Sequence, residues 1–231
     1  MGTNEIKRIA VLVYGVYIEF GMAVRSWKFL NDLNCDVYFS TWNKSKKYSP
    51  KLDVTSEYEV TDELLTKFIP NINYIISDEK NYNFNLKIEK IKFHWQNCFD
   101  MIQNSNKKYD ILMLMRPENY MSNIKSERFL ETDQEGKIFG LEKIRIKPNG
   151  NYFVQDIFFV GNFEIMKDLL LSFPTETDDM HGNMAKQILS KNLNLEVIEN
   201  FNVMTLRPNC NELKEEEINY ENLWKKVTEW E

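Results

Sequence analysis

The sequence predicts an α/β domain in which helices flank a mixed, mainly parallel central sheet. Short Val- and Ile-rich runs, typical of strands buried inside a parallel sheet, alternate with segments whose apolar residues recur every three or four positions. Up to residue 115 these segments give the order β-α-β-α-β-α-β, which is a nucleotide-binding type of layout. A hairpin pattern then replaces the alternation, so antiparallel pairing is expected later in the chain.

The first strand-helix-strand unit is predicted within residues 8–42. Residues 8–14 form an apolar run that ends at Gly15, and "CDVYFSTW" (residues 35–42) has the composition of a second strand. Between them, residues 18–33 carry an apolar stripe at helical spacing. A crossover unit of this length joins parallel strands.

Two further units follow. The Lys-rich residues 43–51 are expected to form a loop, and a helix is predicted from Thr61 to Pro70. "NYIIS" (residues 73–77) predicts a third strand, residues 88–102 an amphipathic helix, and residues 109–115 a fourth strand.

The second half predicts a hairpin and two helices. Strand patterns flank Asn149-Gly150, a dipeptide that supplies the positive φ angles of a tight turn. Helices are expected over residues 163–172 and 180–191, and "LEVIE" and "NVMTLRP" predict short closing strands.

One domain, residues 1–210, is the predicted organisation. Its halves are a nucleotide-binding part (about 7–120) and an acceptor part (about 121–210). The acidic, Trp-containing residues 211–231 are expected to form a C-terminal helix that packs on the domain or serves as an interface, so the oligomeric state stays open.

The composition limits the classes of binding partner and the cellular compartment that we expect. The net charge of -6 argues against a surface built to grip nucleic acid. The longest N-terminal apolar run, residues 9–13, is too short for a signal peptide or a membrane span, so a cytoplasmic protein is expected. Cys35, Cys98 and Cys210 are isolated thiols, more typical of a core than of a disulfide or metal framework.

Polar side chains are expected to gather at one edge of the predicted sheet. Ligands of open α/β sheets bind beyond the carboxyl ends of the strands. Residues 15–17, 41–44, 77–79 and 116–119 all follow predicted strands and should line this rim. No Gly-x-Gly-x-x-Gly or Walker loop follows the first strand, so a bound nucleotide needs another way to hold its phosphates. A divalent cation gripped by a carboxylate is one such way.

Three motifs carry a resemblance to a known family. The segments "RIAVLVYG…CDVYFSTWNKS", "YDILMLMRPENYM" and "VQDIFFVGNFEIM" resemble those of GT-A-fold nucleotide-sugar glycosyltransferases, in particular surface-glycan enzymes of bacteria, phages and large viruses. The likeness spans about residues 7–170. Arg116-Pro117-Glu118 stands where the family has Arg-Pro-Asp, and Arg116 replaces the first carboxylate of an Asp-x-Asp motif. Asn43 stands in place of an aspartate.

The resemblance implies transfer of a sugar from a nucleotide-sugar donor to a glycan acceptor, with a divalent metal (Mn or Mg). It implies three groups of site residues: Tyr14, Gly15, Thr41 and Asn43 for the nucleoside; Arg116 and Glu118 for the diphosphate, with Glu118 and His181 as metal ligands; and Asp156 and Asp179 for catalysis.

Ordinary structural roles remain open for the same residues. Glu118 could be a turn residue paired with Arg116, and Asp156 could cap a helix or pair with Arg145. Asp179 and its acidic neighbours could simply begin a helix, where carboxylates favour the dipole. His94 is expected to be structural. A non-catalytic nucleotide- or glycan-binding protein and another nucleotide-dependent transferase, such as a nucleotidyltransferase, are the alternative functions.

Overall fold

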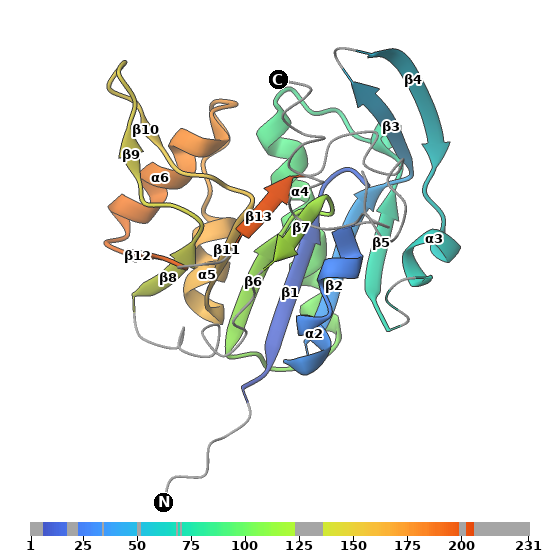
Figure 1. Ribbon diagram of the computed structural model, residues 1–231, viewed down its shortest axis with the longest axis horizontal. Helices are drawn as coiled ribbons and strands as arrows, with labels where there is room; N and C mark the ends of the chain where they lie inside the picture. Colours follow the sequence, from blue (N-terminus) through green and yellow to red (C-terminus); the bar gives the residue numbers. More distant parts are fainter. Residues whose placement is uncertain are drawn as a thin grey trace, which may run out of the picture.

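The computed structural model describes residues 7–17, 23–33, 35–49, 52–67, 69, 71–122, 136–198 and 202–205. Seven of its strands form one sheet, in the order β12-β8-β11-β6-β1-β2-β5 (Figure 1). In chain order they are β1 (Ile9–Tyr14), β2 (Asp36–Trp42), β5 (Asn73–Ser77), β6 (Ile111–Met115), β8 (Lys137–Gly140), β11 (Phe158–Asn162) and β12 (Asn194–Val197).

All but one of these strands run in the same direction. β1 pairs in parallel with β2 and β6, β2 with β5, and β12 with β8. β11 is antiparallel to both of its neighbours, β6 and β8. The predicted fold class, a mixed and mainly parallel sheet flanked by helices, is therefore confirmed.

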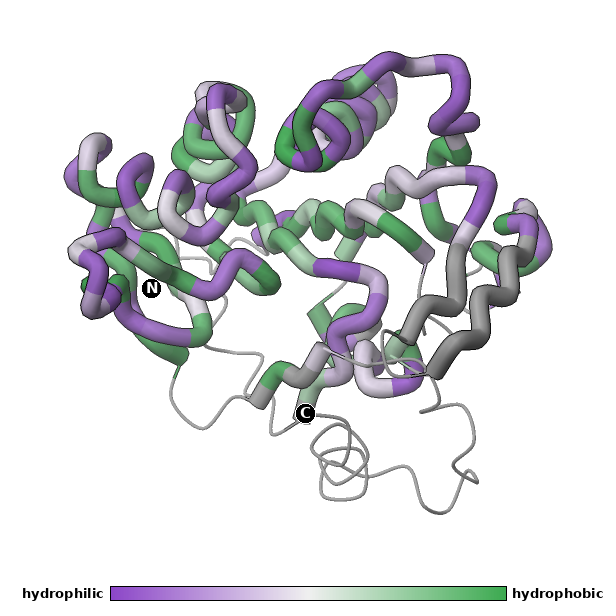
Figure 2. The backbone as a smooth tube through the Cα atoms, turned by 90° about the horizontal axis from the view of Figure 1, so that it is seen from above, coloured by the Kyte–Doolittle hydropathy of each residue, from purple (hydrophilic) through white to green (hydrophobic). Residues whose placement is uncertain are grey.

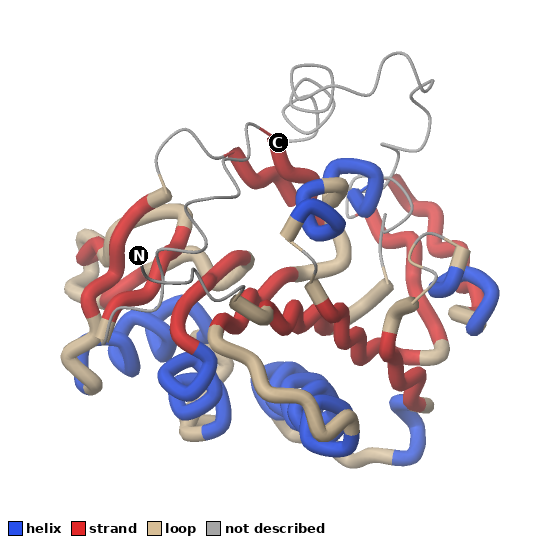
Figure 3. Tube along the Cα trace, turned by 90° about the horizontal axis from the view of Figure 1, so that it is seen from below, coloured by secondary structure: helices blue, strands red, loops and turns tan. Residues whose placement is uncertain are grey.

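The two faces of the sheet pack against different layers. Successive residues of β1 alternate between the two hydrophobic clusters, with Val11 in one and Leu12 in the other. The cluster of Leu12 contains residues of the long helices α4 (Lys87–Asn104), α5 (Phe163–Leu171) and α6 (Met180–Ser190). Figure 3 shows these helices on one side of the sheet, and Figure 2 shows the apolar strands running through the centre.

The opposite face is covered by shorter elements. They are the 3₁₀ turn η1 (Val24–Ser26), α2 (Phe29–Asp32), α3 (Asp62–Thr66) and a two-stranded ribbon of β7 (Asn119–Ser122) and β13 (Asn202–Thr205). The described part of the chain has no helix that is both long and apolar enough to cross a membrane.

α4 forms and begins where the sequence predicts, because of its apolar spacing and a hydrogen bond at its first turn. Its buried residues include Ile88, Trp95, Phe99 and Ile102, which recur at helical spacing. The Glu89 carboxylate accepts a hydrogen bond from the Leu86 backbone N–H at 3.0 Å, which satisfies one of the free donors at the helix start. The helix packs directly on β1 and β2 and fixes the sheet beneath the carboxyl edge.

The helix predicted over residues 18–33 is wrong for the described part of that stretch. Residues 24–26 form the 3₁₀ turn η1 and residues 29–32 the single-turn α2. Contacts with β7 explain the break. The Ser26 hydroxyl accepts from the Met121 N–H at 2.9 Å, and the Trp27 indole donates to the Asn119 carbonyl at 2.7 Å. Such long-range contacts override local helix propensity.

The loop predicted over residues 43–51 is also wrong. Its described residues open a hairpin of β3 (Lys44–Ser49) and β4 (Leu52–Glu59), with a register shift between Lys47 and Ser49. β3 consists of Lys and Ser with a single Tyr, so the usual strand signal is missing there. β4 does carry that signal, because Leu52, Val54 and Tyr58 alternate with polar residues. The tail predicted over residues 211–231 and the thiol Cys210 lie outside the described residues.

Candidate active site at the carboxyl edge of the sheet

The chain changes direction across the sheet beside β1. From β1 it proceeds to β2 and β5 on one side, and it then returns to place β6 on the other side. Such a switch point leaves a crevice at the carboxyl ends of the two strands, where ligands of α/β proteins bind. Gly15 ends β1 there with a φ of +105°, and a Cβ at this position would have no neighbouring heavy atom within 4 Å. The backbone is therefore open to a ligand at this point.

The segment after β6 turns back sharply at the switch point. The Asn119 N–H donates to the Arg116 carbonyl at 3.2 Å and closes the Arg-Pro-Glu-Asn turn. The Asn119 side chain then donates to the Ile157 carbonyl at 2.7 Å, in the loop before β11. Because Asn119 is fully buried, these bonds hold the turn and the loop in a fixed relation.

Arg116 and Glu118 form an ion pair in this turn. Arg116 Nη2 lies 2.6 Å from Glu118 Oε1, and the two side chains keep 40% and 5% of their exposure. Burial opposes the charge of Arg116, but the charges of Glu118 and its neighbours outweigh it and raise the Arg116 pKa. A guanidinium has five N–H donors, so a partly exposed one that pairs with a carboxylate still has donors for an incoming oxyanion.

The strand pattern that follows Asn149-Gly150 predicts Asp156 inside a strand, but this residue lies in the loop just before β11. Because β11 runs against β6, its first residue Phe158 pairs with Met115 at the carboxyl end of β6. The reversed strand thus brings a buried carboxylate to the edge where the parallel strands end. Asp156 is 4% exposed, and its carbonyl accepts from the Tyr14 hydroxyl at 3.2 Å.

His181 lies against Asp156. Its Nδ1 lies 3.1 Å from Asp156 Oδ1 and 3.1 Å from the Val154 carbonyl. A carbonyl can only accept, so Nδ1 carries the proton. The Asp156 carboxylate outweighs partial burial and raises the His181 pKa. The predicted pairing of Asp156 with Arg145 is not formed, since the ion-pair partner of Arg145 is Glu142, at 3.7 Å.

Tyr14 connects the two carboxylates and the arginine electrostatically. Burial is the main reason that its pKa is well above 10, and Asp156 and Glu118 raise it further while Arg116 lowers it. The Tyr14 ring also packs edge-on against Trp95 of α4, with centroids 5.5 Å apart. Its hydroxyl is therefore a neutral donor fixed at the switch point.

Three buried oxygen atoms at this edge lack a hydrogen bond from any described residue: Thr41 Oγ1, Asn119 Oδ1 and Asp156 Oδ1. The approach of His181 to Asp156 is close enough for an ion pair but is not directed as a hydrogen bond. Buried polar atoms are normally paired with protein, water or ligand. These atoms are also closed to solvent, so a bound molecule would reach them only after neighbouring side chains move.

The remaining predicted residues have structural contacts. Asn43 joins neighbouring strands through its backbone, since its N–H donates to the Ser77 carbonyl and its carbonyl accepts from the Val60 N–H, both at 2.8 Å. His94 is buried and bonded to the Ser40 hydroxyl at 2.8 Å, and burial lowers its pKa to about 3. It is neutral and structural, as expected.

Asp179 begins α6 as its N-cap. Its carboxylate accepts from the Gly182 N–H at 3.0 Å and lies so close that a Cβ on Gly182 would be 2.0 Å from Oδ2. This is the ordinary helix-start role that the sequence also allowed. A catalytic role for Asp179 stays a prediction.

The proposed metal ligands are already engaged with other groups. Glu118 pairs with Arg116, and His181 Nδ1 faces Asp156 and a carbonyl, which leaves only its Nε2 for a metal. Over the described ranges, no three His, Cys, Asp or Glu side chains come together in a group that could hold a metal ion. These donors do not fit a metal centre made by the protein alone, so a metal bound by Glu118 and His181 stays a prediction.

Sequence reasoning placed Asn119 at the rim but missed its role as a link between the turn and the Asp156 loop. It also missed the bond from Trp27 to Asn119. Neither contact has a local signal, because 92 residues separate Trp27 from Asn119. The Arg-Pro-Glu-Asn motif was the only available pointer.

Comparisons with known proteins give only distant similarity. No family model matches the chain, and no curated protein matches it. Among solved structures, it is similar to the nucleoside-diphosphate-sugar pyrophosphorylase from Vibrio cholerae RC9, with a TM-score of 0.48, 10% identity and coverage of 96% of this chain and 98% of that chain. It is also similar to A197 from STIV, with a TM-score of 0.40, 11% identity and coverage of 85% and 84%. At such low sequence identity, the similarity concerns the fold and not the function.

Proposed function

We propose that the protein is a glycosyltransferase that uses a nucleotide-sugar donor and a glycan acceptor. The observation that carries this proposal is the arrangement at the switch point. A guanidinium and a buried carboxylate lie at the same edge, beside buried oxygens that have no partner among the described residues. A sugar diphosphate needs a cation for its phosphates, and an attacking hydroxyl needs a base. The family resemblance of the motifs around these residues supports the same function.

The donor would lie across the carboxyl ends of β1 and β6. The open backbone at Gly15 gives space for the approach of the nucleotide, and Arg116 would contact the diphosphate through donors that Glu118 does not occupy. Thr41 Oγ1 would meet a polar group of the nucleoside. The charge that develops on the departing diphosphate would be stabilised by Arg116.

Asp156 would serve the acceptor. If the transfer is inverting, its carboxylate takes the proton of the acceptor hydroxyl while that oxygen bonds to the anomeric carbon. The bond from this carbon to the diphosphate oxygen breaks, and the nucleoside diphosphate leaves with the electron pair. His181 and the hydrogen bond from the Tyr14 hydroxyl to the Asp156 carbonyl would hold Asp156 in place. A retaining transfer would need no separate base.

A thermal-shift screen of UDP-, GDP- and CMP-sugars tests this proposal, with and without manganese. One nucleotide series should stabilise the protein, and the shift should diminish in Arg116→Gln but not in the control Lys108→Gln, which removes an exposed charge elsewhere. Dependence on manganese that vanishes in Glu118→Gln would identify Glu118 as a metal ligand. The absence of stabilisation by any nucleotide would overturn the proposal. Stabilisation without hydrolysis or transfer would favour the non-catalytic binding alternative.

A further inference from the structure

The hairpin of β9 (Arg145–Ile146) and β10 (Tyr152–Phe153) is strongly basic although the protein is acidic. Residues 143–155 contain Lys143, Arg145 and Lys147 and no carboxylate, in a chain whose net charge is -6. Figure 1 shows that the hairpin projects beyond the carboxyl edge of the sheet, beside α6. A concentrated positive charge at this edge attracts anions.

Three cationic or protonatable groups surround one aromatic ring of this hairpin. Arg145 Cζ lies 4.6 Å and Lys147 Nζ 4.4 Å from the centroid of the Phe153 ring. The imidazole of His181 lies 4.6 Å from the same centroid. Contact with the ring face orders the long cationic side chains without neutralising them. They are therefore held close together on one face of the hairpin.

Carboxylates of the protein compensate this charge only weakly. The one ion pair of Arg145 is with Glu142 at 3.7 Å, and the Arg145 side chain is 62% exposed. Throughout the described ranges, the Lys147 side chain has no carboxylate within ion-pair distance, and its ammonium lies over the Phe153 ring. Like charges held side by side are costly unless an anion joins them. The positive charge of the hairpin is thus only weakly balanced by carboxylates of the described residues.

His181 connects this basic face to the proposed catalytic carboxylate. The His181 ring packs on the Phe153 ring, and its Nδ1 lies 3.1 Å from Asp156 Oδ1. We propose that the hairpin binds an oxyanion, a carboxylate or phosphate, carried by the saccharide acceptor. Arg145 and Lys147 contact the anion and thereby bring a hydroxyl of the acceptor to Asp156. The inference rests on the proposed function, because it names the acceptor class of that site.

Binding of an oligogalacturonate to the whole chain, compared with its methyl ester of equal length, tests the proposal. The two probes differ only in charge. The native protein should prefer the charged probe, and Arg145→Gln/Lys147→Gln should weaken that binding about tenfold, since each exposed pair contributes modestly. The control Lys108→Gln/Lys167→Gln removes the same charge elsewhere and should leave the binding unchanged. Inorganic phosphate should compete with the oligogalacturonate, and added salt should weaken its binding.

Equal binding of the two probes, binding of neither, or the same loss in both double variants would overturn the proposal. So would hairpin-dependent binding to vesicles containing phosphatidylglycerol without binding to the oligogalacturonate, which would make the hairpin a membrane contact. The donor is measured separately, by thermal shift with nucleotide-sugars. Hairpin-dependent oxyanion binding without any nucleotide response would overturn the proposed transferase and keep the anion site. A nucleotide response without hairpin-dependent oxyanion binding would overturn the anion site alone.

Discussion

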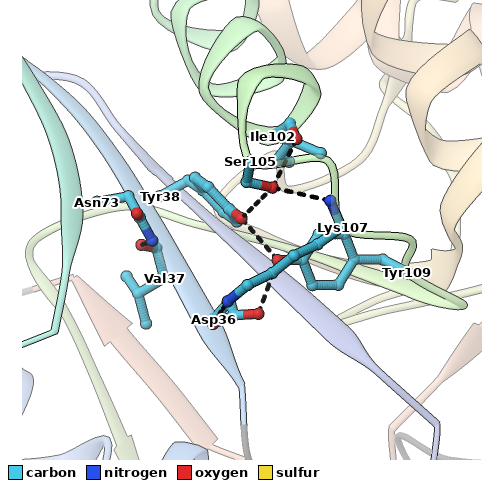
Figure 4. Close-up of polar contacts among 8 residues, drawn as sticks. All are labelled: Asp36, Val37, Tyr38, Asn73, Ile102, Ser105, Lys107 and Tyr109. Atoms are coloured by element: carbon cyan, nitrogen blue, oxygen red, sulfur yellow. Dashed lines mark hydrogen bonds and ion pairs between the residues drawn. The ribbon is translucent and has the colours of Figure 1, made fainter.

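At the amino edge of the sheet, polar side chains form a closed network, whereas at the carboxyl edge several buried oxygens have no hydrogen bond. Figure 4 shows the first network. Asp36 accepts from Lys107 at 2.8 Å and from Tyr109 at 2.7 Å, Tyr109 and Tyr38 share a bond of 2.6 Å, and Tyr38 donates to Ser105 at 3.2 Å. None of these side chains has a buried polar atom left without a partner.

The difference separates an edge whose polar side chains bond to one another from the edge at which we propose that the nucleotide-sugar binds. A closed network at the amino edge gains nothing from a ligand, because its donors and acceptors already satisfy one another. At the carboxyl edge Thr41, Asn119 and Asp156 keep buried oxygens that a bound molecule would satisfy.

Asp156→Asn should cause the largest loss of activity. Without the carboxylate the proposed base of an inverting transfer is lost, so sugar transfer should fall by about 100-fold or more. Asp36→Asn, at the amino edge, should keep the activity and lower the free energy of unfolding by about 1 kcal/mol through weakened hydrogen bonds. Transfer assays and thermal unfolding measure the two effects. Full activity in Asp156→Asn would remove Asp156 from the mechanism.

Gly182→Ala should destabilise the support of His181. The new Cβ would collide with the Asp179 carboxylate that caps α6, and the free energy of unfolding should fall by about 2 kcal/mol. Asp179→Ala should cost about 1 kcal/mol by loss of the cap. The double variant should cost less than the sum, because removal of the carboxylate removes the collision.

Asp179→Ser separates capping from catalysis, because a serine hydroxyl also caps a helix. Stability and transfer rate should both stay close to those of the native protein. A large loss of transfer with unchanged thermal unfolding would show that Asp179 acts in catalysis and would contradict a purely capping role.

Arg116→Gln should weaken the binding of the nucleoside diphosphate about tenfold, the effect of losing one charge-assisted contact to phosphate. Lys107→Gln removes an equal charge at the amino edge and should leave the affinity unchanged. Isothermal titration calorimetry gives both affinities. Because Arg116→Gln also removes a partner of buried Glu118, Arg116→Gln/Glu118→Gln serves as the variant without that unpaired charge. Native affinity in both would exclude Arg116 from the phosphate site.

The two edges should respond to pH in opposite ways, with effects of a few tenths of a kcal/mol after allowance for solvent screening. Burial works against the charge of Asp36, but hydrogen bonds from Lys107 and Tyr109 lower its pKa. Its contribution is present above the unfolded pKa of about 3.9 and is lost as the pH falls through the folded value.

His181 has a raised pKa, so its contribution is complete below the unfolded value of about 6.5 and is lost as the pH rises through the folded value. Urea unfolding at a series of pH values measures both effects. The loss of stability at high pH should disappear in His181→Gln, and the loss of stability at low pH should diminish in Asp36→Asn. A high-pH loss that persists in His181→Gln would contradict the ion pair with Asp156.

The sequence predicted the regular parts of this fold because their signals are local. β5 and β6 end where their apolar runs end, and α4 covers the predicted stripe within two residues at each end. Arg116 and Glu118 could be placed at the site for the same reason, since a strand that ends at the switch point must deliver them there.

The acceptor side could not be predicted in this way. The contact of Asp156 with His181 depends on the reversed direction of β11 and on the loop before it, and neither has a periodic signal. The β3–β4 hairpin was missed because β3 is polar along its length, although β4 alternates Leu52, Val54 and Tyr58 with polar residues. The turn η1 was missed because contacts with β7 replace the expected helix. Long-range packing thus decided the parts that local patterns left open.

A crystal structure with the nucleoside diphosphate of the stabilising series would show directly whether the diphosphate binds to Arg116. Its oxygens should lie within hydrogen-bonding distance of the Arg116 guanidinium, above the open backbone of Gly15 at the carboxyl ends of β1 and β6. A nucleotide bound at the amino edge, or one at the carboxyl edge whose phosphates do not contact Arg116, would contradict it.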